Sequence, residues 1–434
     1  MKMEYRLEEI YNLQMGKTPS RNNLDYWNTT DNKWISIADL SKCGKYIENT
    51  KEYLSNQAVE ESGISQIPAN TVVMSFKLSI GKTAITSEPM YSNEAIMSFR
   101  DKMVTDILPD YIYYLFFNRD WSEGTNKAVM GKTLNKATLS KIKVNIPDMK
   151  SQQKVVEVLD KVNNIIDARK SELKELNKLI KARFVEMFGN GTHEIVKASE
   201  VCDFITKGTT PPTGEITEVY EEEKVPFLKV YNLSFTGEML FDDNPQYISK
   251  ETHNGKLVRS KVYPNDVLMN IVGPPLGKFT LVTDEFDEWN INQAIAIFRA
   301  KERILPRFLL HALMQPKVLE PFIGQAVGIR QQNLSLEQCR NLQFPLPSLE
   351  EQKAFVEFAE QVDKSKVAVQ INKDTTQELL IIYIINIYCY KYTAPDLKNI
   401  KITIAKYTHI WYESIITSNV RVQNMEVYMS RKVI

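Results

Sequence analysis

Three Gly-Lys-Thr tripeptides, beginning at Gly16, Gly81 and Gly131, are the first residues of this 434-residue chain that could bind a phosphate. A phosphate-binding P-loop needs another glycine five residues earlier, so that successive backbone N–H groups surround the phosphate. No glycine stands at that distance from any of the three, and the related segment Gly273–Lys278 is one residue too short. Motifs of zinc proteases, serine hydrolases, dinucleotide-binding enzymes and amino-methyltransferases are also missing. We therefore expect no catalysis by this chain alone.

Two polar loops, residues 126–136 and 328–333, carry side chains that suit DNA. Lysine and arginine pair with phosphates, while arginine, glutamine and asparagine can contact base edges through two hydrogen bonds. One such loop is usually only solvated, but these two lie at equivalent places in a repeated sequence. The formal net charge is zero, so a DNA-binding surface must be a local basic patch. The predicted DNA-binding residues are Lys17, Arg21, Lys82, Lys127, Lys132, Asn135, Lys136, Lys229, Lys278, Arg330, Gln331, Gln332 and Asn333.

The elements that position these residues come from a tandem duplication. Residues 146–154 resemble residues 346–354, and Gly16–Pro19 resembles Gly208–Pro211. Further matches keep the same order at an offset of roughly 192 to 200 residues, so only small loop insertions separate the copies. The chain therefore contains two similar globular units.

Each unit is predicted to have an α+β fold. Short segments rich in β-branched and aromatic residues indicate half-buried strands. A Leu-Pro pair then precedes an apolar segment in each unit, Tyr111–Asn118 and Phe308–Met314, with proline suitably placed for a helix start. The predicted strands are Trp34–Leu40, Thr71–Phe76, Ala95–Phe99, Phe227–Leu233, Asp266–Ile271, and a last strand in each unit at Ile142–Ile146 or Leu342–Leu346.

Between the units, Ser151–Phe188 lacks proline and glycine and is predicted to be one long helix that Gly189 ends. Its apolar residues recur at alternating steps of four and three, which is the pattern of a coiled coil, with Arg169 as one polar member. A helix of roughly 38 residues would span about 57 Å. The predicted seam residues are Val155, Leu159, Val162, Ile166, Leu173, Leu176 and Ile180.

The partner helix should follow the second unit. Phe355, Ala359 and Val362 continue the same seam at the repeat offset, but from about Ile371 the pattern is expected to fail. The seam of the first helix would then lack part of its partner near Leu173, Leu176 and Ile180, leaving apolar surface that favours dimerisation, aggregation or weaker assembly. The apolar run Leu379–Tyr390 is too short to span a bilayer.

Composition sets further bounds. The four cysteines are widely separated, which argues against a zinc site and a disulfide framework. No secretory signal is recognised at the start, so we expect a cytoplasmic protein without a membrane segment.

Repeated units that end in Pro-x-x-x-x-Gln, each followed by a heptad helix, resemble the specificity subunit of type I restriction-modification enzymes over roughly residues 4 to 370. The resemblance implies two target-recognition domains separated by two long helices that form an antiparallel coiled coil. Each domain would read one half of a bipartite DNA site, and the helices would set the gap. The implied boundaries are a first recognition domain at 1–148, a central helix at 149–189, a second recognition domain at 190–347, the start of a distal helix at 348–370, and an atypical tail at 371–434.

The resemblance also implies partners. The chain would bind double-stranded DNA, methyltransferase subunits and, in the full complex, a restriction and translocase subunit. S-adenosylmethionine, ATP and Mg²⁺ would act in those partners, with no cofactor or metal in this chain. Two alternatives are an assembly-impaired or silent specificity variant, because of the tail, and a non-catalytic coiled-coil scaffold protein. A stand-alone DNA-modifying enzyme is disfavoured by the missing motifs.

Overall fold

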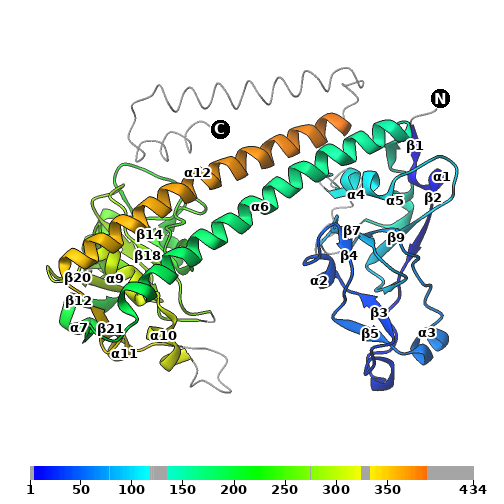
Figure 1. Ribbon diagram of the computed structural model, residues 1–434. Coiled ribbons are helices and arrows are strands. Elements are labelled where there is room, and N and C mark those ends of the chain that lie inside the picture. The colour runs from blue at the N-terminus through cyan, green and yellow to red at the C-terminus, as the bar shows by residue number, and fades with distance from the viewer. Residues whose placement is uncertain are drawn as a thin grey trace. The chain divides into compact units, whose positions relative to one another are not determined.

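The computed structural model describes residues 4–77, 79–117, 119, 121, 134–273, 275–323 and 333–388, with side chains up to Leu380 (Figure 1). The chain forms two compact units. The described part of the first contains residues 4–168 and the end of the last helix from Lys373, and the second contains Arg169–Asn372.

The first unit is built on a five-stranded sheet in the order β2-β9-β6-β7-β4, accompanied by a three-stranded sheet β5-β3-β8 and a pair β1-β10. Its helices are α1 (Leu7–Ile10), η1 (Leu24–Tyr26), α2 (Ile37–Leu40), α3 (Asn56–Ser62), α4 (Pro109–Phe117) and α5 (Lys136–Ser140). Its strands are β1 (Glu4–Arg6), β2 (Tyr11–Met15), β3 (Asn32–Ile35), β4 (Tyr46–Ile47), β5 (Glu52–Leu54), β6 (Val72–Ser75), β7 (Thr83–Thr86), β8 (Tyr91–Ser92), β9 (Ile96–Asp101) and β10 (Lys143–Asn145).

The second unit repeats this topology. Its sheet β12-β20-β17-β18 corresponds to β2-β9-β6-β7, and β14 pairs in parallel with β19 as β3 does with β8. Its helices are α7 (Ala198–Val201), η2 (Thr213–Glu215), η3 (Val230–Asn232), α8 (Lys250–Asn254), η4 (Val258–Ser260), α9 (Pro306–Leu313), α10 (Pro316–Ile323) and α11 (Leu336–Arg340). Its strands are β11 (Glu194–Lys197), β12 (Cys202–Lys207), β13 (Ile216–Thr217), β14 (Lys224–Leu228), β15 (Tyr247–Ser249), β16 (Lys261–Val262), β17 (Val267–Asn270), β18 (Phe279–Leu281), β19 (Trp289–Ile291), β20 (Ile295–Ala300) and β21 (Gln343–Leu346).

Two strand predictions need correction. The segments Trp34–Leu40 and Phe227–Leu233 each contain the end of a strand followed by one helical turn, α2 or η3. In the first, Ser36 and Asp39 form a capping box that starts α2, so the strand stops at Ile35.

The central strands β6 and β17 are also buried along their whole length rather than half-buried, because α4 and α9 pack against these sheets.

The helix predicted between the units is α6, Met149–Phe188. A Cβ atom on Gly189 would lie 2.4 Å from the Val185 carbonyl oxygen, so this position favours glycine. In the first unit, Leu159 and Ile166 belong to the buried core, and Val155 and Val162 pack against it. In the second unit Ile180 is buried, Leu176 packs against the core and Leu173 is half-buried.

The predicted failure of the distal helix is wrong. The helix α12 runs from Leu349 to Tyr388 and contains 40 residues, as α6 does. Its seam continues through Lys366, which is buried, and through Lys373 and Thr376, which are half-buried, to the buried Leu380. Lysine can bury its aliphatic stem while its ammonium group stays near polar partners, so it does not interrupt such a seam. The rest of the predicted tail, 389–434, lies outside the described residues.

The helices α6 and α12 pack together along antiparallel directions (Figure 1). Near the end of α6, Phe184 contacts Phe355 at the beginning of α12, and both belong to the core of the second unit. In the first unit, Leu380 shares a core with Leu159 and Ile166 of α6. Because Leu176 and Ile180 pack in the cluster that contains Phe355, Ala359 and Val362, the expectation that they lack a partner is also wrong.

In the part of the chain that the structure describes, none of the helices has the length and apolar character of a membrane span.

Candidate nucleic-acid interface

The repeated Gly-x-Thr-Pro segments begin with a glycine that packs directly against the backbone. A Cβ atom on Gly16 would lie 2.0 Å from the Ser92 carbonyl oxygen, and one on Gly208 would lie 2.2 Å from that of Asn292. These distances exclude any side chain. The segment is thereby held beside the parallel pair β3-β8 or β14-β19, and its glycine has a structural role.

The two Gly-Lys turns lie at equivalent places in the two units, where one joins β6 to β7 and the other joins β17 to β18. Gly81 has φ 89° and Gly277 has φ 95°, in the region that favours glycine. The backbone N–H of Lys82 donates to Ser75 Oγ at 3.0 Å, and that of Lys278 donates to Asn270 Oδ1 at 2.8 Å. Each turn therefore holds its lysine at a fixed place beyond the end of the sheet.

The end of each polar loop lies against the end of the same hairpin strand. The Leu134 N–H donates to the Phe76 carbonyl at 3.2 Å, and the Leu334 N–H donates to the Ile271 carbonyl at 2.9 Å. Asn333 also forms an isolated antiparallel β-bridge with Val272. The structure thus brings together, in each unit, two segments that were predicted separately from the sequence.

The side chains at these places differ in availability. Lys82, Lys136 and Asn333 are exposed, and Lys278 is half-buried. Asn135 is exposed too, but its Oδ1 accepts the Thr138 N–H at 2.8 Å and so caps α5. Five of the predicted residues lie outside the described part of the chain: Lys127, Lys132, Arg330, Gln331 and Gln332.

Two other predicted residues are held by partners within the first unit. The Arg21 guanidinium forms an ion pair with Glu52 and lies 3.7 Å from the centre of the Trp27 ring. The Lys17 ammonium donates to the Ser62 carbonyl. A phosphate would have to compete with these contacts, so the geometry favours Lys82 over Arg21 and Lys17 as a DNA contact.

In the second unit, Lys229 is half-buried and its backbone N–H donates to Asn232 Oδ1 at 2.9 Å. The same segment continues to Phe235, which the sequence reasoning missed. Phe235 is 49% exposed, and the Lys278 ammonium lies 5.8 Å from its ring centre. The backbone of Ser234 pairs with Phe279, next to Lys278. A sequence signal for Phe235 exists, because it lies in a repeated segment: Leu-Ser-Phe-Thr-Gly at 233–237 matches Leu-Ser-Lys-Cys-Gly at 40–44.

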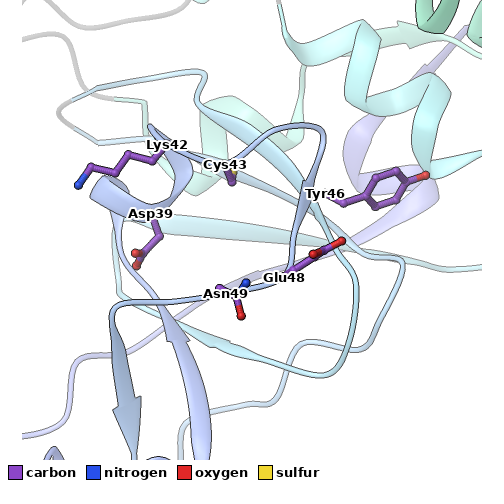
Figure 2. A pocket seen from close by; sticks show the side chains of 6 residues that line it. All are labelled: Asp39, Lys42, Cys43, Tyr46, Glu48 and Asn49. Carbon is purple, nitrogen blue, oxygen red and sulfur yellow. The ribbon is translucent and has the colours of Figure 1, made fainter. Parts of the chain in front are cut away.

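A shallow depression beside the matching segment of the first unit is shown in Figure 2. It is lined by Asp39, Lys42, Cys43, Tyr46, Glu48 and Asn49. Asp39 is already used in capping, since it accepts the backbone N–H groups of Ser36 at 2.8 Å and Lys51 at 3.2 Å. Burial raises the pKa of the Cys43 thiol, which disfavours a reactive thiolate. This arrangement holds no activated nucleophile.

The described residues contain no group of three or more His, Cys, Asp or Glu side chains suited to a metal ion. Cys43, Cys202 and Cys339 are free thiols, and burial raises the pKa of Cys202 and of Cys339 to about 12. Cys389 lies outside the described residues. What the site offers chemically is hydrogen-bond donors and positive charge at equivalent places in both repeats.

Comparison with known proteins identifies the same two repeats. The family described as "Type I restriction modification DNA specificity domain" matches residues 2–178 and again residues 190–380. The MjaIX specificity subunit of Methanocaldococcus jannaschii is 27% identical over 250 residues, which span 52% of this chain and 57% of that relative. The EcoBI specificity subunit of Escherichia coli is 24% identical over 76% of this chain and 72% of its own length.

A solved structure has a similar fold. It is described as showing complex assembly and conformational transition of the type I R-M system. One of its chains aligns with a TM-score of 0.57 and 17% identity, covering 89% of this chain and 99% of the other.

Proposed function

The chain belongs to the family of type I restriction-modification DNA specificity proteins, and from this premise we propose that each of its two repeats reads one half of a bipartite DNA sequence. The observation that carries the proposal is the duplication of the candidate interface. In each repeat a Gly-Lys turn and the end of a polar loop are held together by equivalent hydrogen bonds. Two similar surfaces on one chain suit a site with two separate halves.

The proposed division of labour follows from the side chains. Lys82 and Lys278 contact phosphates and thereby fix the register of each domain on the duplex. Polar side chains of the adjoining loops contact base edges in the major groove, where each base pair presents a distinct pattern of donors and acceptors. Phe235 offers an apolar contact, for example to a thymine methyl group.

The helices α6 and α12 act as the spacer between the half-sites. An α-helix of 40 residues spans about 60 Å. Because the two helices pack against each other antiparallel, the spacer is stiffer than a single helix. The unread gap then follows from helix length.

The chemical steps belong to partner proteins in this proposal. Methyltransferase subunits use S-adenosylmethionine, and a restriction and translocase subunit uses ATP and Mg²⁺, in a cytoplasmic complex on double-stranded DNA. The alternative of an assembly-impaired variant is not favoured, because α12 continues to Tyr388, where an incomplete distal helix was expected. No feature of the described residues favours the scaffold alternative.

The test is long-read mapping of DNA methylation in cells that carry the methyltransferase subunit, with this gene intact or deleted. We expect deletion to abolish methylation at one bipartite adenine-containing motif, which would also reveal the half-sites and the gap. An unchanged methylation pattern, with expression of both proteins confirmed, would contradict the proposed function.

A further inference from the structure

The glutamine of the repeated Pro-x-x-x-x-Gln motif is buried in both repeats. The Gln152 side chain lies in the first turn of α6 and is 0% exposed. Its Oε1 accepts the Leu108 N–H at 2.8 Å. Its Nε2 donates to the Asp106 carbonyl at 2.8 Å and to the Pro147 carbonyl at 2.9 Å. One carboxamide therefore joins the start of α6 to the segment that leads into α4.

Gln352 repeats this arrangement at the start of α12. It is also 0% exposed, and its Oε1 accepts the Leu305 N–H at 2.8 Å. Its Nε2 donates to the Arg303 carbonyl at 3.1 Å and to the Pro347 carbonyl at 3.0 Å. A buried polar group that loses its partners is costly, so both glutamines are held in one geometry. The neighbouring Gln153 and Lys353 are exposed.

A charged contact joins the same domain and helix a second time. In the first unit, the Lys45 ammonium lies 2.7 Å from Asp160 of α6 and 2.5 Å from Asp110 of α4. Asp160 also accepts the Tyr114 hydroxyl. Asp160 follows Gln152 by two helical turns, about 12 Å along the axis. Two attachments at this separation oppose rotation of the domain about either one alone.

The second unit has a corresponding contact with different residues. Arg307 of α9 pairs with Asp363 of α12 at 2.6 Å, and Lys366 of α12 pairs with Glu238 at 2.8 Å. Burial alone would raise the pKa of Asp363, but Lys366 and Arg307 hold this pKa below its ordinary value, so the carboxylate stays charged. The glutamine attachment is therefore common to both repeats, whereas the charged attachment is specific to each.

We propose that Gln152 and Gln352 are positioning residues that, together with the charged contacts, fix each recognition domain on the helix that follows it, so that only one gap between half-sites is accepted. This inference rests on the proposed function. A spacer of fixed length sets a fixed gap only if each domain keeps a fixed orientation on its helix. The buried carboxamide supplies that restraint at the first turn, where the domain and the helix meet.

The experiment uses the full chain in complex with its methyltransferase subunit. Half-sites known from methylation mapping are placed in duplexes with the native gap and with gaps one base pair shorter and longer. The initial methylation rate is measured for each duplex. The readout is the ratio of the rate at the native gap to the rate at the altered gaps, which a loss of folded protein would not change.

Gln152→Met and Gln352→Met keep similar side-chain length but remove the hydrogen bonds. We expect each to lower the ratio by about tenfold or more, since several buried hydrogen bonds are lost. The matched control Gln153→Met, on the next and exposed residue, should leave the ratio unchanged. Lys45→Met removes the second attachment while leaving Gln152 intact, and it should also lower the ratio. It therefore tests the inference even if Gln152→Met does not fold.

Variants that fold, lose overall rate and keep the wild-type ratio would overturn the inference while leaving the proposed function standing. A wild-type complex that methylates no bipartite motif would overturn the proposed function, and the inference with it.

Discussion

The aromatic rings of Phe184 and Phe355 meet edge to face, with their centres 5.4 Å apart, where α6 ends and α12 begins. Phe308 of α9 lies beside both rings, 5.5 Å from Phe184 and 6.1 Å from Phe355. This cluster joins α6 and α12 to the core of the second unit. Helix pairing and domain folding are therefore coupled there.

Phe355→Ala should lower the free energy of unfolding by about 3–5 kcal/mol, because it leaves a cavity at a residue that is 0% exposed. Chemical denaturation monitored by circular dichroism would measure the change. Phe117→Ala is the control, since Phe117 is 44% exposed and its removal should cost much less. Equal losses in the two variants would contradict the assigned core role.

Matched insertions in the two helices should lengthen the gap of the methylated motif. One heptad placed between Glu172 and Lys178 and another between Lys366 and Val369 add about 10.5 Å, equivalent to roughly three base pairs. The insertions are paired because α6 and α12 pack against each other. Methylation mapping should show both half-sequences unchanged with a longer gap.

An insertion in α6 alone is the control for this experiment. It shifts the seam of α6 relative to α12, so we expect loss of methylation rather than a longer gap. A native gap in the doubly extended protein would show that the helices do not set the spacing.

Lys82→Gln and Lys278→Gln should each weaken DNA binding by the assembled complex. Loss of one phosphate contact should reduce the slope of log K against log salt by about 0.9. Titration of labelled duplex at several salt concentrations measures this slope. Lys102 and Lys301 follow the strands β9 and β20, at the end of each sheet opposite to the Gly-Lys turn. Lys102→Gln and Lys301→Gln are therefore the matched controls. An equal loss of slope in the controls would place the DNA contact elsewhere.

Phe235→Ser should impair recognition of the second half-site with little change in stability. The side chain is 49% exposed, so its loss from the folded protein should alter the free energy of unfolding by only about 0.5 kcal/mol. Methylation rates on duplexes with single base changes would measure discrimination at each half-site. The first half-site is the internal control, and unchanged discrimination at both would remove Phe235 from the interface.

We expect the buried His311 to make the folded protein less stable in mild acid. Burial lowers the pKa of this histidine to about 4, below the value of about 6.5 in an unfolded chain. The unfolded state therefore binds more protons between these values, and stability should fall as the pH falls from about 6.5 to 4. This difference in pKa between the folded and the unfolded state corresponds to a loss of about 3 kcal/mol in the free energy of unfolding. His311→Gln should flatten this part of the profile of unfolding free energy against pH; the same slope in the variant would contradict the assignment.

The repeated segments and the helix signals could be read from the sequence alone. The two copies of the Pro-x-x-x-x-Gln motif predicted the duplication, and absence of proline and glycine from Ser151–Phe188 predicted α6. These signals are local, because they depend on which residues favour or end a helix.

The expectation that the seam of α12 fails from about Ile371 is wrong, because Lys373 and Thr376 do not interrupt it. Side-chain type alone does not say how a lysine stem packs, whereas the folded chain places both residues half-buried between Val369 and Leu380. Arg21 stays a predicted DNA contact, and its pairing with Glu52, 31 residues away, is an interaction that the sequence pattern alone does not predict.

The sequence by itself determined that this is a duplicated α+β chain with a long helix after the first copy, the start of a matching helix after the second, and candidate DNA contacts in equivalent loops. Only the tertiary structure decided which of those contacts lie together and what the repeated glutamine does. Gln152 and Gln352 are buried against carbonyl and N–H groups more than 40 residues earlier in the chain. Hydrogen bonds between such distant segments form only when the chain has folded, because their geometry depends on the packing of the whole domain.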